Sequence, residues 1–580
     1  MNRVNRAGRA GEVPRRRVYF ILLAFTVFMG SIGVKLVSYQ VLRGADLGLS
    51  ARQAHARDEP VPARRGVTYD STGAVLASTI QSDRVFAIVE RVEDDQEFAR
   101  ALAGPLALAP AEIVARLREG REKRQAWVQL KRHLSPAASD QIRALGLEAV
   151  VLDPEPRRVY PNGDFASHLL GFANWDMTGA YGVEGAYDAE LGGKPGHLVA
   201  ERDVHGNVIT VGRSRFDPPV NGYDAVLTIN AAIQRTVEQQ LDAAIKSQQA
   251  AGGTAIVMDV RTGAILALAG RPSFDPNRFE QFDLDVFSNP AISALYEPGS
   301  TFKVLTMATG LETGAVSTNT VFYDKPGYLV IDNKTIRNAS GAVYGKETMS
   351  EVLQHSSNLG AAFIAERVGS EAFYAKLREF GLGQATGVDL QGEEEGLVLW
   401  DTAPDWRPIN LTTNAFGQGI TVTPLQMLTA VSAVVNGGRL MRPYVVQELR
   451  QDGRVVRRNE PQVVRQVVSP QVSRAVVEMM TDVVDNVSFP YVGVPGYAVG
   501  SKSGTAQIPA PGGGYIEGDV TIGSMIGIGP AEDPRFAVFV KIDRPQKDPW
   551  GVHVAGPPVR AVLRDLFTLY AIPPSRRVKD

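Results

Sequence analysis

The chain has 580 residues, of which 44% are hydrophobic, and it carries a formal net charge of −2. A chain of this length is expected to form two or more domains, and its near-zero charge gives no sign of nucleic-acid binding. It contains no cysteine, which excludes disulfides, thiol catalysis and thiolate metal sites, and its seven histidines show none of the spacings of metal ligands. We therefore expect neither a metal nor another cofactor.

An apolar run near the N-terminus predicts a membrane anchor. Residues 1–17 contain six arginines and one glutamate, residues 18–34 carry no charge, and after Lys35 the apolar character continues to Val41. The stretch 18–41 is long enough to span a bilayer, and the arginines before it predict a cytoplasmic tail with the rest of the chain outside. A cleaved signal peptide is the alternative, but the apolar run is long for one and no small-residue cleavage site follows closely. We expect a single-pass protein of the inner or plasma membrane.

The next region, residues 42–220, predicts a mixed domain without chemistry of its own. Arg64–Gly73 has the pattern of a strand that leads into a turn. Helices are predicted at Asp94–Ala103, Pro110–Glu119 and Pro136–Leu147. No constellation of nucleophile and base stands in this region, so we expect a scaffold or docking module.

The pattern changes near Asn221 to that of a second mixed domain, predicted at 221–580. A helix face is marked by apolar residues at spacing four, namely Ile233, Val237, Leu241 and Ile245. A closing helix is predicted at Val559–Tyr570. Strands are predicted at Asp224–Asn230, Ala255–Val260, Ala264–Ala269, Ile522–Pro530 and Arg535–Ile542. Strands near both ends with helices between them imply that the two ends of the domain pack on one sheet.

Three short polar motifs follow one another in this second region. They are Ser300-Thr301-Phe302-Lys303, Ser356-Ser357-Asn358 and Lys502-Ser503-Gly504-Thr505. Each is weak alone, since about one S-x-x-K is expected by chance in a chain this long. Together and in this order they are specific for a serine acyl-transfer site that uses no histidine. A second S-x-N, Ser317-Thr318-Asn319, is rejected because it follows too closely on the Ser300 helix and lies in polar loop sequence.

The first motif supplies a nucleophile and its base. A serine hydroxyl needs a base within hydrogen-bond reach, and residues i and i+3 share a helix face, so Lys303 can lie beside the Ser300 hydroxyl. Tyr296–Gly299 predicts a turn just before this helix. Ser300 then lies in the first helical turn, where free backbone N–H groups favour developing negative charge. Burial and a nearby cation lower the pKa of a lysine, and Lys502 can supply that cation.

The second motif can relay the proton and hold the substrate. Glu351–Gly360 predicts the end of a helical turn followed by a loop. Ser356 can pass a proton between Lys303 and the leaving group, and Asn358 can hold a substrate amide. The neighbouring His355 is expected to be a packing or loop residue.

The third motif predicts a strand at the edge of a sheet. Gly504 has no Cβ, so an extended substrate can approach closely and add as a further strand. Ser503 or Thr505 can bind a substrate carboxylate, with Lys502 as the nearby positive charge. The backbone N–H groups of Ser300 and Thr505 are the expected oxyanion-hole pair.

Over nearly its whole length the sequence resembles the class B penicillin-binding proteins, which are peptidoglycan D,D-transpeptidases. In the N-terminal region the similarity is carried by Arg65-Gly66 with Asp70 and Gly73, Arg158-Val159-Tyr160-Pro161, Gly182-Val183-Glu184-Gly185, and Arg202-Asp203 with Gly206. In the C-terminal region it is carried by the three motifs, Tyr296–Gly299 and Phe416-Gly417-Gln418-Gly419. Ser503 departs mildly from the family pattern, because threonine is commoner there.

The resemblance implies a membrane-anchored multidomain α+β protein. Its parts are a tail at 1–17, an anchor helix at 18–41, a pedestal (dimerisation-like) domain at 42–220 and a transpeptidase domain at 221–580. In the transpeptidase domain, helices flank an antiparallel sheet, and an all-α subdomain lies beside it.

The resemblance also implies a two-step reaction. Ser300, activated by Lys303, attacks the D-Ala-D-Ala bond of a donor stem peptide and releases D-alanine, and an amine of a neighbouring stem peptide then takes the acyl group. β-Lactams mimic the donor and acylate Ser300. The pedestal is too short for a glycosyltransferase domain, which implies a separate membrane glycosyltransferase of the SEDS type as partner. The segment from Tyr160-Pro161 to Gly196 resembles the division (septal) group more than the elongation group.

Other classes of protein share parts of this pattern. A β-lactamase needs a deacylating base, for which the sequence shows no clear glutamate motif. A D,D-carboxypeptidase uses the same motifs with water as acceptor, so it stays open, as does an elongation-type transpeptidase. A β-lactam sensor usually has further membrane spans, and an inactive division scaffold is expected to have lost a catalytic position, whereas all are present here.

Overall fold

The structure, a computed structural model, describes residues 15–43, 56–201, 214–510, 512, 514–516, 518 and 520–576. The chain forms two compact units, one of Met1–Ala63 with Lys194–Val220 and the other of Arg64–Gly193 with Asn221–Asp580. Most of the predicted tail at 1–17 lies outside the described residues, and so does the predicted signature of Arg202-Asp203 with Gly206.

The first unit contains the predicted apolar helix. α1 spans Arg15–Val37 and continues into one π-helical turn at Ser38–Leu42. The most apolar 18-residue window of this helix has a mean hydropathy of 2.2, and no side chain of α1 is buried. At 1.5 Å per residue its 28 residues reach roughly 42 Å, more than the ~30 Å hydrocarbon core of a bilayer. The hydroxyls of Thr26 and Ser31 donate to backbone carbonyls of the same helix, so these polar groups are satisfied internally, as lipid requires.

The first unit also contains a three-stranded antiparallel sheet that the sequence did not predict. Its order is β1-β8-β9, with β1 at Ala56–Val61, β8 at Gly196–Glu201 and β9 at Ser214–Asp217. β1 and β8 pair along their whole length. The sequence of β1 is ARDEPV, and its three charges and proline hide the alternation by which a strand is recognised.

The N-terminal part of the second unit is a sheet covered by helices. Its strands are β2 (Thr68–Tyr69), β3 (Val75–Ile88), β4 (Trp127–Leu134) and β5 (Val150–Val159), and its helices are α3 (Asp95–Leu106), α4 (Pro110–Glu122) and α5 (Pro136–Ala144). Phe98, Leu102 and Leu117 from the helices share one buried cluster with Val85 and Leu130 from the strands. The three predicted helices are confirmed, and α5 ends before the predicted Leu147.

This sheet continues into the C-terminal half of the chain. Its order is β21-β20-β10-β2-β3-β4, with β5 also paired to β3. The added strands are β10 (Asp224–Leu227), β20 (Val446–Gln451) and β21 (Arg454–Arg458). β10 pairs in parallel with β2 and antiparallel with β20. Segments from both predicted domains therefore share one hydrogen-bonded sheet, which no local pattern indicated.

The C-terminal part is built on a five-stranded antiparallel sheet in the order β12-β11-β25-β24-β23. The strands are β11 (Gly252–Asp259), β12 (Ile265–Arg271), β23 (Gly500–Gln507), β24 (Thr521–Gly529) and β25 (Phe536–Asp543). Ala255 and Val257 join a hydrophobic cluster on one face, whereas Ile256 and Met258 join the cluster on the other. Because side chains of a strand alternate between faces, this sheet is buried on both. The predicted strand pairs are confirmed.

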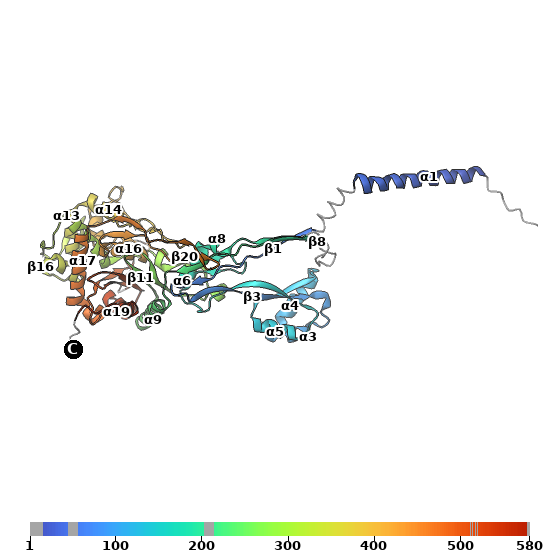
Figure 1. The fold of residues 1–580 in the computed structure, drawn as a ribbon. Coiled ribbons are helices and arrows are strands. Elements are labelled where there is room, and N and C mark those ends of the chain that lie inside the picture. Colours follow the sequence, from blue (N-terminus) through green and yellow to red (C-terminus); the bar gives the residue numbers. More distant parts are fainter. Residues whose placement is uncertain are drawn as a thin grey trace, which may run out of the picture. The chain divides into compact units, whose positions relative to one another are not determined.

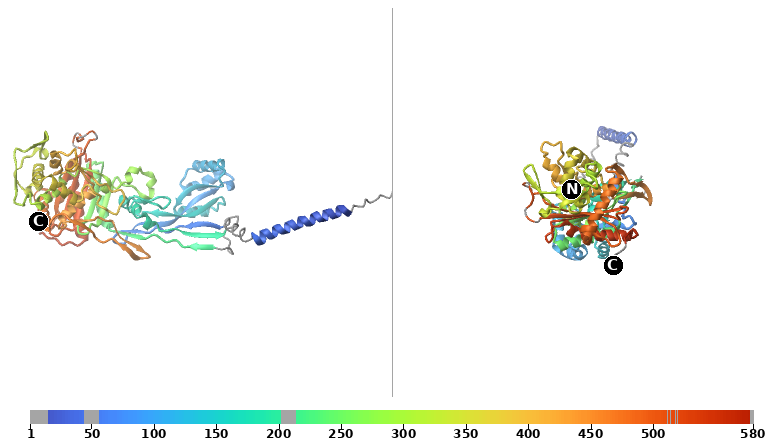
Figure 2. Two further views of the ribbon diagram at one scale, coloured as in Figure 1. Left: turned by 90° about the horizontal axis from the view of Figure 1, so that it is seen from above. Right: turned by 90° about the vertical axis from the view of Figure 1, so that its left-hand side faces the viewer.

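Helices cover both faces of this sheet (Figures 1 and 2). α9 (Ala231–Gln248) and α19 (Gly551–Leu569) pack on one face. α11 (Lys303–Glu312), α16 (Pro424–Val435) and α17 (Pro470–Val483) contribute to the cluster on the other face. Every residue of α16 is buried, including the polar residues Gln426, Thr429 and Ser432.

The closing helix α19 starts earlier than predicted. It begins at Gly551 rather than Val559 and contains Pro557 and Pro558. Proline removes a helix hydrogen bond and reads as a helix breaker. Val554 and Ala555 are buried against the sheet, and this packing offsets the lost hydrogen bonds.

The region between β12 and β23 contains most of the helices of the C-terminal part. Its further helices are α12 (Met349–Gln354), α13 (Asn358–Val368), α14 (Ser370–Glu379) and α15 (Pro408–Asn414). It also contains two short antiparallel strand pairs that were not predicted, β13 (Val321–Asp324) with β16 (Gly345–Thr348) and β14 (Leu329–Ile331) with β15 (Lys334–Ile336).

Shorter elements complete the second unit. They are α6 (Ser167–Leu170), β6 (Phe172–Ala173), β7 (Gly179–Ala180), α7 (Gly182–Ala186), α8 (Asp188–Gly192), α10 (Pro290–Ser293), β17 (Leu397–Val398), β18 (Ile420–Thr421), β19 (Arg439–Met441), β22 (Val463–Gln466) and α18 (Phe489–Val492). The predicted multidomain α+β class, with helices on both sides of an antiparallel sheet, is confirmed.

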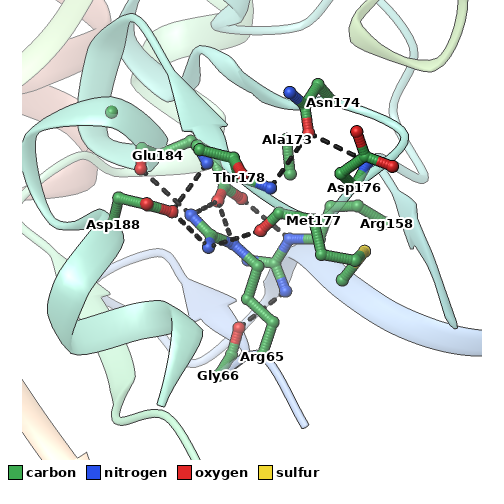
Figure 3. A network of polar contacts seen from close by, with 12 residues as sticks. Arg65, Gly66, Arg158, Ala173, Asn174, Asp176, Met177, Thr178, Glu184 and Asp188 are labelled. Atoms are coloured by element: carbon green, nitrogen blue, oxygen red, sulfur yellow. Dashed lines mark hydrogen bonds and ion pairs between the residues drawn. The ribbon is translucent and has the colours of Figure 1, made fainter. Parts of the chain in front are cut away.

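A buried ion network ties the N-terminal part of the second unit together (Figure 3). The Glu184 carboxylate on α7 accepts from Arg65 Nε at 2.7 Å and from Arg158 Nε at 2.8 Å, and the three side chains are at most 2% exposed. Arg65 also donates to Asp188 at 2.6 Å, and Arg158 donates to the Gly66 carbonyl at 2.6 Å. Burial by itself raises the pKa of Glu184, but the two guanidinium groups outweigh it and hold that pKa below its ordinary value. Three of the sequence signatures thus meet in one cluster.

Replacement of Glu184 by glutamine should destabilise the protein strongly. It leaves two buried guanidinium groups with one carboxylate fewer, and the loss of one partner from a buried ion pair costs about 3–5 kcal/mol. Thermal unfolding of the full chain in detergent measures this as a fall in Tm. Asp153→Asn is the control, because its pair with Arg84 is largely exposed and such pairs contribute about 1 kcal/mol or less. Equal Tm values for both variants would contradict the expectation.

Candidate active site

Ser300 lies in a short 3₁₀ turn, Gly299–Phe302, that runs directly into α11. In a 3₁₀ turn the side chains of residues i and i+3 lie one above the other. The Lys303 Nζ therefore approaches the Ser300 Oγ to 2.9 Å. The predicted turn and helix are confirmed, with Ser300 at the point where the helix begins.

The Lys303 amine is surrounded by oxygen atoms of the second motif. Its side chain is buried, with Nζ 2.6 Å from the Ser356 carbonyl oxygen and 2.7 Å from the Asn358 Oδ1. Burial lowers the pKa of Lys303 well below its ordinary value, the Lys502 ammonium lowers it further, and the Glu347 carboxylate acts in the opposite direction. A depressed pKa increases the neutral fraction of the amine, and only the neutral amine can accept a hydroxyl proton.

Ser356 connects the two lysines. Its Oγ lies 3.3 Å from the Lys303 Nζ and 2.9 Å from the Lys502 Nζ. Burial lowers the pKa of Lys502 to about 7. Ser356 has φ of 56°, a left-handed conformation that costs a residue with a Cβ about 1–2 kcal/mol and that only its surroundings can hold.

Asn358 is the first residue of α13, so the prediction of a loop at this position is wrong. The Ser357 Oγ caps the helix and accepts from the Gly360 N–H at 3.0 Å. Serine and asparagine favour loops but also begin helices, which explains the error. The Asn358 Oδ1 contacts Lys303, and its Nδ2 donates to the Arg337 carbonyl at 3.0 Å. Asn358 thus orients the Lys303 amine, and its contact with a substrate amide stays a prediction.

The third motif lies on β23, which is the edge strand of its sheet, as predicted. Lys502 is buried, whereas Ser503 and Thr505 are partly exposed. The Thr505 Oγ1 accepts from the Gly551 N–H at 2.9 Å, so its own hydrogen is available to another acceptor.

Two glycines allow the backbone to come close to the turn that carries Ser300. A Cβ on Gly504 would lie 2.8 Å from the Pro298 carbonyl oxygen, and one on Gly417 would lie 2.2 Å from the Gly299 carbonyl oxygen. The Gly299 N–H donates to the Gly417 carbonyl at 3.0 Å. Gly504 is therefore required by the fold itself, a reason that the sequence did not show.

Glu297 holds two other segments at the same turn. Its Oε1 accepts from the Gly419 N–H at 2.9 Å and its Oε2 accepts from the Tyr515 hydroxyl at 3.0 Å. Burial raises the pKa of Glu297. The resemblance included this residue, but its partners were not predicted.

The residues that hold the second motif were missed. The Asn338 Oδ1 accepts the N–H groups of Asn358 at 2.8 Å and of Leu359 at 3.1 Å, and its Nδ2 donates to Asp324 at 2.9 Å. Asn338 and Asp324 belong to the segment of the unpredicted strands β13–β16. No motif or periodicity relates them to the motif they support.

His355 and Ser317 have the positions that the sequence favoured. The His355 ring stacks on Tyr344 at a centroid distance of 4.5 Å, and its Nδ1 lies 3.0 Å from the Glu347 Oε1. Ser317 lies in the loop after α11, with its hydroxyl 3.3 Å from the Thr320 Oγ1. Among the described residues, no group of three or more histidine, aspartate or glutamate side chains is placed to hold a metal.

Comparisons with known proteins agree with this geometry. Residues 253–564 match the family model of the penicillin-binding protein transpeptidase domain, and residues 60–227 match that of the penicillin-binding protein dimerisation domain. The chain is 33% identical over 569 residues to stage V sporulation protein D of Bacillus subtilis, covering 97% of this chain and 87% of that protein. It is 31% identical over 566 residues to the peptidoglycan D,D-transpeptidase FtsI of Escherichia coli K12, covering 96% and 91%.

A solved structure is similar as well. It is that of penicillin-binding protein 3 from Mycobacterium tuberculosis complexed with aztreonam, with a TM-score of 0.68 and 28% identity. The similarity covers 90% of this chain and 100% of that one.

Removal of the Lys502 cation should move the pH dependence of acylation. Without it the pKa of Lys303 rises, so the acidic limb of the rate of Ser300 acylation by a chromogenic penicillin should shift to higher pH in Lys502→Ala. Stopped-flow rates across the pH range measure the limb. Lys123→Ala, which removes an exposed lysine of α4, should leave it in place. An unshifted limb in Lys502→Ala would show that Lys502 does not act on the base.

Proposed function

The chain belongs to the class B penicillin-binding proteins, and we propose how its three motifs crosslink peptidoglycan. The resemblance predicted from the motifs is confirmed. The protein is a serine-type peptidoglycan D,D-transpeptidase. We infer the roles of individual residues from their contacts and from elementary acyl-transfer chemistry.

The contact that carries this proposal is the 2.9 Å between the Lys303 Nζ and the Ser300 Oγ. Neutral Lys303 takes the hydroxyl proton as Oγ attacks the carbonyl carbon of the scissile D-Ala-D-Ala bond. The N–H groups of Ser300 and Thr505 stabilise the oxyanion of the tetrahedral intermediate. The C–N bond then breaks, and Ser356 passes the proton from Lys303 to the departing D-alanine nitrogen. The product is an ester between Ser300 and the donor peptide.

The donor peptide binds along the free edge of β23. Lys502 supplies positive charge for its terminal carboxylate, and the Ser503 and Thr505 hydroxyls donate to that carboxylate. The Thr505 hydroxyl keeps its hydrogen for this purpose, because the Gly551 N–H occupies it only as an acceptor. One Nδ2 hydrogen of Asn358 remains after the bond to Arg337, and it can donate to a carbonyl of the substrate amide.

The second step transfers the acyl group to an amine of a neighbouring stem peptide. The amine attacks the ester carbonyl, its proton passes to Lys303, and the Ser300 oxygen leaves and is protonated again. A D,D-carboxypeptidase would use water here, and product analysis separates the two.

Two buried carboxylates support the motifs, Glu297 and Glu347, and both oxygens of each are engaged by other residues. Neither forms a hydrogen bond with the Ser300 hydroxyl, which contacts Lys303 instead, and this disfavours a hydrolytic β-lactamase.

Membership of the family implies that β-lactams bind at the same site. The strained amide of the drug takes the place of the D-Ala-D-Ala bond and acylates Ser300, and the adduct hydrolyses slowly. The related protein of Mycobacterium tuberculosis has been solved in complex with aztreonam.

The replacement Ser300→Ala should abolish the covalent adduct with benzylpenicillin, because no nucleophile remains at the site. Intact mass spectrometry of the full chain in detergent, with peptide mapping, measures the adduct. Ser317→Ala, in the other S-x-N segment, should be labelled as fully as the unchanged protein. An adduct that persists in Ser300→Ala would overturn the assignment, and hydrolysed drug without an adduct on the unchanged protein would favour a β-lactamase.

We further propose that the protein works at the division septum. Stage V sporulation protein D and FtsI are among its relatives. Similarity to these two proteins favours the septal type of class B penicillin-binding protein over the elongation type. The parts of the chain are a cytoplasmic tail at 1–17, an anchor at 18–41, a pedestal at 42–220 and an extracytoplasmic transpeptidase domain at 221–580. The pedestal and anchor dock a membrane glycosyltransferase of the SEDS type, because the dimerisation-domain match occupies residues 60–227, between the anchor and the transpeptidase domain.

A fusion to the N-terminus tests both the orientation and the septal role. A fluorescent protein that matures only in the cytoplasm should fluoresce there, because the arginines before α1 keep the tail inside. Microscopy of dividing cells should place the signal at the septum. A dark fusion of normal abundance would contradict the orientation, and a signal along the side wall would favour the elongation type.

A further inference from the structure

The Glu347 carboxylate is fully buried next to the active site, and it takes no direct part in the two steps of acyl transfer. It lies on β16, where its strand partner is Phe322 of β13. Its side chain is 0% exposed. Burial of a carboxylate is unfavourable by several kcal/mol unless its oxygens accept hydrogen bonds. The groups that contact the two Glu347 oxygens therefore indicate the role of this residue.

Both oxygens of Glu347 contact the second motif or its neighbour. The Ser357 hydroxyl donates to Oε2 at 2.9 Å, and the His355 Nδ1 lies 3.0 Å from Oε1. The Ser357 Oγ also accepts from the Gly360 N–H at 3.0 Å. The hydroxyl hydrogen of Ser357 therefore points to Glu347, and a lone pair of the same oxygen points to the first turn of α13. These two hydrogen bonds fix the Ser357 side chain.

Ser357 stands between the two residues of the second motif that contact the catalytic base. Ser356 precedes it with a left-handed backbone and places its carbonyl oxygen 2.6 Å from the Lys303 Nζ. Asn358 follows it and places its Oδ1 2.7 Å from the same nitrogen. A displacement of Ser357 would therefore move both contacts at once and would release the strained backbone of Ser356.

We propose that Glu347 is a positioning residue of the acyl-transfer reaction, an inference that rests on the proposed function. Its carboxylate holds Ser357, and through Ser357 it keeps Ser356 and Asn358 against the Lys303 amine. Glu347 touches neither Lys303 nor Ser300 directly, so it acts through the second motif.

The charge of Glu347 adds a second effect on the base. The charged groups that act on Lys303 are the Lys502 ammonium, which lowers its pKa together with burial, and the Glu347 carboxylate, which raises it. Burial raises the pKa of Glu347, whereas hydrogen bonds from His355 and Ser357 and the charge of His355 lower it, and Asp324 raises it. Loss of the Glu347 charge should therefore favour the neutral form of Lys303.

Two substitutions separate these effects in the full chain in detergent, with acylation by a chromogenic penicillin as the reaction. In Glu347→Gln the side chain keeps its shape and can still accept from Ser357, but the charge is lost, so the acidic limb of the rate should move to lower pH. In Ser357→Ala the charge remains, but the link to Glu347 and the cap of α13 are lost, so the rate on the plateau should fall about tenfold with the limb in place. Glu351→Gln is the matched control. It removes an exposed carboxylate that bonds only Thr348 at the start of α12, and it should leave both rate and limb unchanged.

The outcomes distinguish this inference from the proposed function. If the unchanged protein is not acylated at Ser300, the proposed function fails. If it is acylated and Ser357→Ala matches it in the plateau rate, the positioning role is wrong. If Glu347→Gln matches it in pH dependence, the effect of the Glu347 charge on the base is wrong. A fall in Tm of either variant with unchanged acylation would show that Glu347 serves stability alone, which also overturns the proposal.

Discussion

The active site depends on keeping one amine out of water and close to a set of neutral oxygens. The Lys303 Nζ lies 2.6–3.3 Å from oxygens of Ser300, Ser356 and Asn358, and its side chain is buried. None of these contacts supplies a full negative charge. The unfavourable desolvation of the ammonium is therefore offset only in part, by the more distant Glu347 carboxylate, and its proton is held weakly. A more exposed lysine would stay protonated at neutral pH, and one paired with a carboxylate would as well.

That constraint requires several elements to meet closely. The turn before α11, the start of α13 and the edge strand β23 each carry one motif, and they converge on the two lysines. Gly417 and Gly504 leave room for backbone against the turn that carries Ser300. The sheet is buried on both faces and packed by helices, which gives the motifs a rigid support. The strained backbone of Ser356 is retained because the contacts around it are made by these packed elements.

Polar contacts also tie the N-terminal part of the second unit to the transpeptidase part. The Glu184 carboxylate, which lies on α7, accepts hydrogen bonds from Arg65 and Arg158. The Asp389 carboxylate accepts from the Tyr187 hydroxyl at 2.7 Å and from the Val445 N–H at 2.6 Å. Together with the sheet in which β2 pairs with β10, these bonds explain why both parts belong to one compact unit. A boundary drawn from composition alone does not capture this.

The sequence by itself determined the chemistry and most of the regular elements. Ser300 and Lys303 are three residues apart, so local helical geometry is enough to pair them, and the short apolar run of Ala255–Val260 is enough to show a strand. Only the tertiary structure decided what surrounds them. Glu347, Asn338 and the partners of Glu297 are brought to the site by strand pairs and loops whose short, polar sequences carry no periodic signal. Burial, which sets the proton affinity of Lys303, arises only when segments more than fifty residues apart pack together.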